Sequence, residues 1–376
     1  MIKKIKNIAL ANKPFLIIPE ALRDELLSSW LVRTAYAHHT HPHTFVTLFL
    51  GQRYNYIFSN NIDSILLDKE ISTIQQKSLQ KVNIFQMTLK SYETYLQERI
   101  INNGFNKLLC TLRFCPKCLK EDMVPHFRKF WKVAFYTVCI KHKCFMHDCC
   151  PHCNTKIDIS KMYQNKLSFQ YCYKCGFDLK QSKTVILNKE MQSNLFLYEK
   201  LLDTLNKGYI VLNQSFVYSF YFFDAMIQLS KKTLRHRYTE FIKNNINFEY
   251  LQTITLKPSQ IIQQHLSIIE QYVINCIIMN LFENYPKNFE RYLKTNKLSH
   301  WQTLQDMGYV SFWFESLTNS LVPFKIYNAK LITNEEIESA KAYLISKGII
   351  VNKSNMSRLT GCDFHSSYNK LGNHIS

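Results

Sequence analysis

A cysteine-rich stretch between Cys110 and Cys175 constrains this sequence most, because it holds ten of the twelve cysteines. Four metal-ligand half-sites follow one another in it, each with two residues between its ligands. This spacing lets a tight turn aim two side chains at one tetrahedral ion. The half-sites pair into two predicted four-ligand centres, which are Cys115, Cys118, Cys139 and His142 in the first and Cys150, Cys153, Cys172 and Cys175 in the second.

Each predicted centre has four protein ligands and leaves no position open for water or substrate, which is typical of structural zinc. We therefore expect two structural Zn²⁺ ions per chain. The repeated Cys-Pro-x-Cys motif favours Cys150 as a ligand, with Cys149 as the alternative. Gly176 suits the left-handed backbone that ends such a turn. The spare candidates are Cys144, His147 and His152, and Cys110 is expected to be a small buried residue.

The charge of the chain points to a polyanionic partner. The 376 residues include 47 basic and 28 acidic ones, so the formal net charge is +19. Such an excess favours nucleic acid over a membrane surface. Glycine is scarce, with eight residues, and neither of the common glycine-rich nucleotide-binding motifs occurs.

The predicted compartment is a reducing cytoplasm. Clustered thiols fit that environment better than an oxidising one. The opening residues do not form the apolar run of a secretory signal, and no apolar stretch is long and clean enough to span a bilayer.

The N-terminal part is predicted to be helical. Leu22, Leu26 and Trp30 recur at helical spacing, with Asp24 as the N-cap. A polar break and a second helix, ended by Gly51, complete the outline of a helix-turn-helix or, equally, of an ordinary helical hairpin. Residues 52–108 also look helical, and their apolar stripe consists of Leu79, Val82, Phe85, Leu89 and Tyr92.

Periodic aromatic residues predict a short amphipathic helix over 127–135, inside the first centre's long loop. Its polar side carries three cations that can contact phosphate or, equally, form a solvated face: Arg128, Lys129 and Lys132. Apolar residues over 157–169 predict a hairpin in the loop of the second centre, and hence a ribbon-like module.

The C-terminal half is predicted to be helical after a connector at 183–190. A helix over 259–283 is apolar almost all round, which predicts the core of this domain. A capping box at Thr333 opens a helix that Gly348 stops. Ser354 and Asp363 are expected to cap two short helices, which resemble a second helix-turn-helix or a subdomain that docks a protein. The expected nucleic-acid contacts of its last helix are His365, Ser366, Asn369 and Lys370.

Two sets of motifs resemble a known family in order and spacing. The first set runs from Pro19 through 24–31 to Arg33 and Ala35. The second set includes 113–119, 127–131, the Cys139-x-x-His142 half-site and the Cys150-Pro-x-Cys153 half-site. Together they resemble the TniQ family over roughly residues 15–176.

The resemblance implies a non-catalytic adaptor that selects the target in transposition. Such adaptors recognise target DNA directly or bind an RNA-guided CRISPR effector complex with its guide RNA. They then recruit an AAA+ transposition regulator. A second copy of the chain is a further candidate partner, and no membrane is expected.

The expected fold is mostly α-helical, with three domains. Residues 1–109 form a helix-turn-helix-like domain, 110–182 a tandem zinc-finger or zinc-ribbon module, and 183–376 a C-terminal helical domain. Two other functions are weighed against the adaptor. One is a zinc-containing, sequence-specific transcriptional regulator, and the other is an HNH-type nuclease that would use His147 and Asp148. We do not expect an enzyme, because His142 is better used as a zinc ligand and no separate catalytic metal set stands outside the cysteine cluster.

Overall fold

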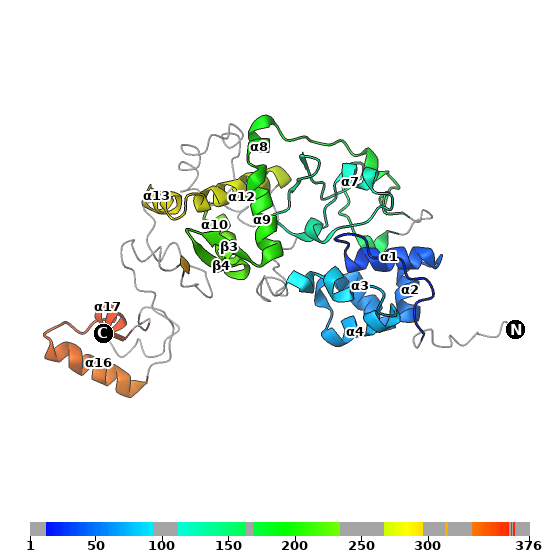
Figure 1. The fold of residues 1–376 in the computed structure, drawn as a ribbon. Coiled ribbons are helices and arrows are strands. Elements are labelled where there is room, and N and C mark those ends of the chain that lie inside the picture. Colours follow the sequence, from blue (N-terminus) through cyan, green and yellow to red (C-terminus); the bar gives the residue numbers. More distant parts are fainter. Residues whose placement is uncertain are drawn as a thin grey trace. The chain divides into compact units, whose positions relative to one another are not determined.

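The computed structural model describes a mostly α-helical chain. The residues that it describes are 13–92, 112–162, 168–233, 267–295, 313–314, 333–360, 362 and 364. The chain divides into two compact units, Met1–Phe289 and Glu290–Ser376, whose elements are labelled in Figure 1. Among the described residues, no helix is long and apolar enough to cross a membrane.

Four helices form the N-terminal part of the first unit: α1 (Leu27–Ala37), α2 (Pro42–Phe49), α3 (Gln52–Ile65) and α4 (Asp68–Lys77). Buried aromatic rings of α1 and α2 pack on Phe15, whose ring centroid lies 5.1 Å from that of Phe45. The polar break before α2 ends where the His41 side chain accepts a hydrogen bond from His43 N and Pro42 takes the first helical position. The second predicted helix is therefore confirmed.

The predicted start of the first helix is wrong. Asp24 is not an N-cap, because it has a φ of 59° and α1 begins only after Leu26. The reason is tertiary pairing of the backbone before the helix. Leu26 N donates to Phe127 O at 2.9 Å, and Lys129 N donates to Asp24 O at 2.9 Å. These bonds hold residues 24–26 against the cysteine-rich region.

The predicted apolar stripe over 79–92 does not form one helical face. Leu79 lies in a turn with a φ of 53° and is 52% exposed. The chain then makes two short turns, α5 (Ile84–Met87) and η2 (Leu89–Tyr92). Val82 and Leu89 are buried, whereas Phe85 is exposed. The rest of this predicted segment, 93–108, lies outside the described residues.

The cysteine-rich region is built from short elements: α7 (Pro116–Glu121), η3 (Lys129–Lys132), β1 (Val138–Cys139), β2 (Cys144–Phe145), η4 (Ile159–Lys161) and η5 (Leu179–Gln181). The amphipathic helix predicted over 127–135 is wrong, since only the 3-10 turn η3 forms there. Its backbone bonds to distant segments, as in Arg113 N donating to Trp131 O at 3.1 Å. The aromatic side chains still make a buried core of Phe127, Trp131 and Phe135.

The hairpin predicted over 157–169 is also not seen in the described residues. Ile157 forms an isolated bridge with Leu112, and Ile159 lies in η4. Residues 163–167 lie outside the described ranges. Ile157 therefore pairs with a residue that precedes the first cluster and not with a neighbouring strand of a hairpin.

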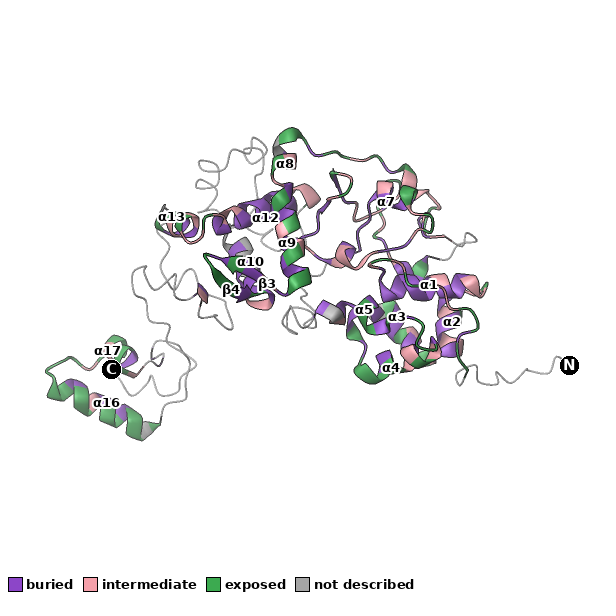
Figure 2. Cartoon of the chain, in the orientation of Figure 1, coloured by how far each residue is buried: buried purple, intermediate pink, exposed green. Residues whose placement is uncertain are grey.

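The other described elements as far as Thr295 are α8 (Lys189–Ser193), α9 (Leu195–Lys207), β3 (Tyr209–Leu212), β4 (Ser215–Tyr218), α10 (Ser219–Thr233), α12 (Ile268–Phe282) and α13 (Lys287–Thr295). Figure 2 shows α12 buried along most of its length, which confirms the predicted core helix. A capping box of Ser267 and Glu270 opens it, and residues 259–266 are not described. The β3–β4 hairpin, which turns at Asn213 and Gln214, was not predicted.

The second unit contains α16 (Asn334–Ser346) and α17 (Lys353–Thr360). The predicted capping box of Thr333 and Glu336 is confirmed, and Gly348 follows the helix with a φ of 67°. The predicted cap at Ser354 is wrong. The helix begins at Lys353, and Asn352, two residues before Ser354, accepts through Oδ1 from Asn355 N at 2.8 Å. The helix predicted after Asp363 lies outside the described residues, as do 365–376.

Candidate metal centre

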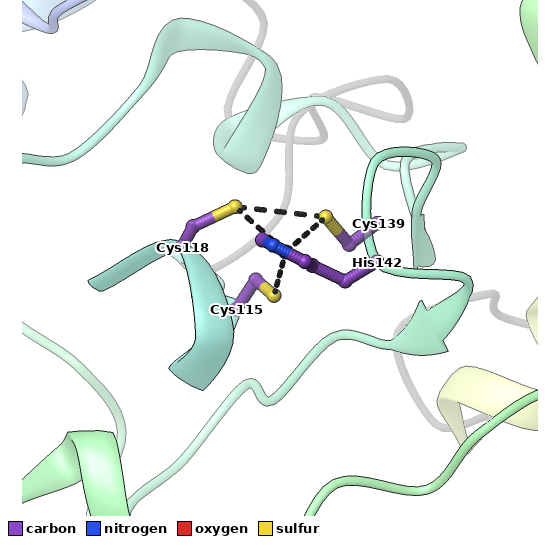
Figure 3. Close-up of side chains that lie close together, drawn as sticks. All are labelled: Cys115, Cys118, Cys139 and His142. Carbon is purple, nitrogen blue, oxygen red and sulfur yellow. Dashed lines mark hydrogen bonds between the residues drawn. The ribbon is translucent and has the colours of Figure 1, made fainter. Parts of the chain in front are cut away.

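The first four-ligand cluster lies between α7 and the β1–β2 hairpin (Figure 3). Cys115 is the N-cap of α7 and Cys118 lies in its first turn, while Cys139 ends β1 and His142 lies in the hairpin turn. All four ligand atoms lie within 4.8 Å of one another. His142 Nδ1 is 3.4, 3.3 and 3.5 Å from the Sγ atoms of Cys115, Cys118 and Cys139.

These separations fit a tetrahedral ion. Zinc bonds of about 2.3 Å to sulfur and about 2.0 Å to nitrogen place two sulfur ligands about 3.8 Å apart and sulfur and nitrogen about 3.5 Å apart. The Sγ atoms of Cys118 and Cys139 are 3.6 Å apart. The donor set and its spacing therefore suit zinc, with four protein ligands and no place for a reacting water.

Glu121 orients the histidine of this cluster. His142 Nε2 lies 2.8 Å from Glu121 Oε1, and Glu121 Oε2 lies 2.6 Å from Lys141 Nζ. Hydrogen bonds from Lys141 and His142 lower the pKa of Glu121. A carboxylate that accepts from Nε2–H leaves Nδ1 free to bind a metal. This contact could not be predicted from the sequence, because it depends on where α7 ends.

The second cluster joins Cys150, Cys153, Cys172 and Cys175, whose Sγ atoms also lie within 4.8 Å of one another. Two of the Sγ pairs, Cys150 with Cys175 and Cys153 with Cys172, are each 3.7 Å apart. Cys150 and Cys172 are buried, whereas Cys175 is exposed. This cluster has the same closed geometry at a more exposed place.

Left-handed residues close three of the four ligand turns. Lys143 follows His142 with a φ of 50°, Asn154 follows Cys153 with a φ of 54°, and Gly176 follows Cys175 with a φ of 70°. In the second cluster, Asn154 N donates to Cys150 O at 2.8 Å and Gly176 N donates to Cys172 O at 2.9 Å. The left-handed backbone expected at Gly176 is confirmed.

The spare residues take other places. Cys149 is outside the second cluster and forms a bridge with Lys156. His147 stacks on Phe114, and burial lowers its pKa. His152 stacks on Phe177, and Cys144 Sγ lies 3.7 Å from Cys115 Sγ. Cys110 lies outside the described residues.

Two of the three cations predicted in the first centre's loop have acidic partners within the protein. Arg128 Nη2 lies 2.7 Å from Asp122 Oδ1, and its guanidinium lies over the Trp131 ring. Lys132 Nζ lies 2.8 Å from Asp63 Oδ2. Internal partners thus engage these two charges, and phosphate contact stays a prediction for both.

Lys129 lies in a largely buried polar group beside Asp24. Its Nζ lies over the Tyr92 ring, 4.9 Å from the centroid. Burial lowers the pKa of Lys129. Burial also raises the pKa of Asp24 to about 6, against the opposing charge of Lys129. Phosphate contact by Lys129 stays a prediction, and the four predicted contacts from His365 to Lys370 lie outside the described residues.

Buried polar contacts tie the cluster region to α12 on its other side. The Arg113 guanidinium donates to Ala134 O at 2.8 Å, Tyr136 O at 3.0 Å and Gln271 Oε1 at 2.6 Å. Asn275 Nδ2 donates to Phe135 O at 3.3 Å. The first cluster is therefore fixed between the N-terminal helices and the core helix α12.

This arrangement defines a mostly α-helical protein with two closed clusters of four candidate metal ligands. Residues 16–146 match the model of the TniQ family. This part of the chain is a TniQ domain. The match contains the whole first cluster and ends before the second. The domain implies a role in transposition-associated target selection. A search of curated proteins found no match.

Proposed function

We propose that this chain is a non-catalytic adaptor that selects the target of a transposition system. The TniQ domain over residues 16–146 is the observation that carries the proposal. The adaptor binds target DNA or an RNA-guided CRISPR effector complex with its guide RNA, and it recruits the AAA+ transposition regulator. It acts in the cytoplasm, where thiol ligands stay reduced. A second copy of the chain is a further partner in this proposal.

Both clusters hold structural zinc in this proposal. Thiolate and imidazole donors in a tetrahedral arrangement select zinc among the common divalent ions. Four protein ligands at each cluster leave no position for a metal-bound water, so the ions stabilise the fold and do not activate a nucleophile. The eight ligands are the residues that the spacing of the half-sites predicts.

The charge of the chain supports a nucleic-acid partner. A formal charge of +19 favours association with phosphate backbones. The proposed contacts include Arg128, Lys129 and Lys132, and the C-terminal residues His365, Ser366, Asn369 and Lys370. If phosphate contacts supply the affinity, the logarithm of the binding constant falls steeply and linearly with the logarithm of the salt concentration.

The direct test is co-purification with the AAA+ regulator of the proposed transposition system, followed by a reconstituted insertion assay. We expect the chain to bind the regulator and to make insertion depend on a defined target. Sequence-specific repression of a reporter without regulator binding would indicate a transcriptional regulator instead. Nicking of a plasmid in Mg²⁺ or Mn²⁺ that is lost in His147→Ala would indicate a nuclease and refute the adaptor.

A further inference from the structure

A fifth thiol lies against the first cluster. Cys144 is fully buried, and its Sγ lies 3.7 Å from the Sγ of Cys115. Two sulfur ligands of one tetrahedral zinc lie about 3.8 Å apart. The Cys144 thiol therefore stands at a ligand-like distance from one ligand, although it is not among the four atoms that lie within 4.8 Å of one another.

The β1–β2 hairpin brings this thiol to the cluster. Cys144 in β2 pairs directly with Cys139 in β1. Residues directly opposite each other on antiparallel strands project to the same face. One of the two opposed cysteines is a ligand, and the other lies beside the ligand Cys115.

The backbone at Cys144 is held from both sides. On one side it pairs with β1, and on the other it bridges to Ile186, with Phe145 N donating to Val185 O at 2.9 Å. The strand therefore fixes the backbone of Cys144 beside the cluster. The histidine ligand lies two residues earlier, in the hairpin turn, and is only partly buried.

We propose that Cys144 is a reserve ligand of the first centre. While His142 binds the ion, the Cys144 thiol donates an S–H···S hydrogen bond to the Cys115 thiolate. When the imidazole is absent or withdrawn, Cys144 releases its proton to solvent and binds as the fourth thiolate. The Zn²⁺ ion keeps its oxidation state, and the net charge of the centre changes from −1 to −2.

The proposal rests on metal binding by the first cluster and not on target selection. The test uses the full chain loaded with Co²⁺, whose charge-transfer absorption rises with the number of bound thiolates. We expect His142→Ala to keep both ions and to gain thiolate absorption. We expect His142→Ala/Cys144→Ala to lose the ion of the first cluster.

A matched control is His142→Ala/Cys149→Ala, because Cys149 is a spare cysteine of the same region that lies outside both clusters. This variant should keep both ions, as His142→Ala does. The single variant Cys144→Ser should keep both ions and the wild-type spectrum, which shows that the strand folds without the thiol.

Two results would overturn the proposal. In one, His142→Ala already loses the first ion, with no further loss on removing Cys144. In the other result, His142→Ala keeps the first ion but gains no thiolate absorption, which means that water fills the fourth position. A wild-type chain that takes up no Co²⁺ at the first cluster refutes the metal site itself and is thereby distinguished from failure of the reserve ligand.

Discussion

The two metal clusters share one geometry but differ in what surrounds them. Cys115, Cys118 and Cys139 of the first cluster are all buried, whereas Cys175 of the second is exposed. Distant segments enclose the first cluster, from the strand-like residues before α1 to the core helix α12. The second is closed by backbone bonds within its own turns.

This difference separates two uses of a closed cluster of four ligands. The first cluster is a junction, because the loop between its half-sites carries the residues that bind the N-terminal helices and α12. The second is mainly a local staple: it shapes its own two turns, and the loop between its half-sites packs on α1 through the Tyr36 and Phe169 rings, whose centroids are 5.9 Å apart. Loss of the first should therefore reach far beyond the ligands, and loss of the second should reach less far.

Removing one ligand from each cluster is the strongest test of this contrast. We expect Cys115→Ala to unfold the first unit, because structural zinc contributes on the order of 10 kcal/mol, as much as a whole domain's stability. Cys175→Ala should release the second ion and loosen mainly its own turns and the loop between its half-sites. Zinc analysis with limited proteolysis distinguishes the two outcomes, and equal protease sensitivity of both variants would contradict the contrast.

Breaking the ion pair between Lys132, in the first cluster's loop, and Asp63 of α3 should have the next largest effect. Asp63 is buried and also accepts from Ser28 N at 2.7 Å and Ser28 Oγ at 2.8 Å. Lys132→Met leaves this carboxylate without its cation, at a cost of about 3–5 kcal/mol.

The matched control is Lys156→Met near the second cluster. Lys156 pairs with Asp148 at 2.7 Å, but the two side chains are 58% and 34% exposed. We expect a loss below about 1 kcal/mol, because solvent screens such a pair. Urea denaturation measures both changes, and similar losses would remove the distinction between junction and staple.

Asp24 gives the junction a pH dependence. Burial raises its pKa from 3.8 to about 6, so the folded state binds the proton more tightly than the unfolded state does. Its contribution to stability therefore grows as the pH falls through 6 toward 4. Asp24→Asn, which tolerates a φ of 59°, should stabilise the protein at pH 7.5 by up to about 3 kcal/mol.

The comparison of variant and wild type across pH checks this sign. The difference in the free energy of unfolding should shrink between pH 7.5 and pH 4, even if acid weakens metal binding in both proteins. Asp68→Asn is the control, since the Asp68 side chain is 91% exposed. A stabilisation by Asp24→Asn that stays constant down to pH 4 would exclude the raised pKa.

The smallest expected effect concerns the carboxylate behind His142. Glu121→Ala should weaken metal binding at the first cluster by about 10–100-fold, since such partners hold the imidazole in its binding orientation. The second cluster should keep its affinity. Competition with a chelator measures both, and Asp203→Ala, which removes an exposed partner of Lys207, is the control.

The ligand sets could be predicted because their geometry is local. Two ligands separated by two residues lie on one turn, so the sequence spacing alone brings Cys115 beside Cys118 and Cys150 beside Cys153. The core helix α12 could be predicted because it is apolar on every side. These features do not depend on what the rest of the chain does.

The failed predictions concern backbone that pairs over long distances. Residues 127–135 have helical periodicity, yet Phe127 O accepts from Leu26 N, which is incompatible with a continuous helix there. Asp24 has the residue type of an N-cap, but its carbonyl accepts from Lys129 N and the helix begins only after Leu26. The contact of Glu121 with His142 was missed because it follows from where α7 ends. Cys144 was only a spare candidate from the sequence, because its place beside Cys115 follows from how β1 pairs with β2.

The long contacts around the first cluster also set an order of assembly. The bond between Ser29 and Phe127 spans 98 residues, that between Asp63 and Lys132 spans 69, and that between Arg113 and Gln271 spans 158. Cys115 and His142, in contrast, are 27 residues apart. Short loops close faster than long ones, and contacts of high sequence separation slow folding. The first ion can therefore be captured early during synthesis, and α12 docks on a metal-loaded nucleus only after another 130 or so residues have emerged.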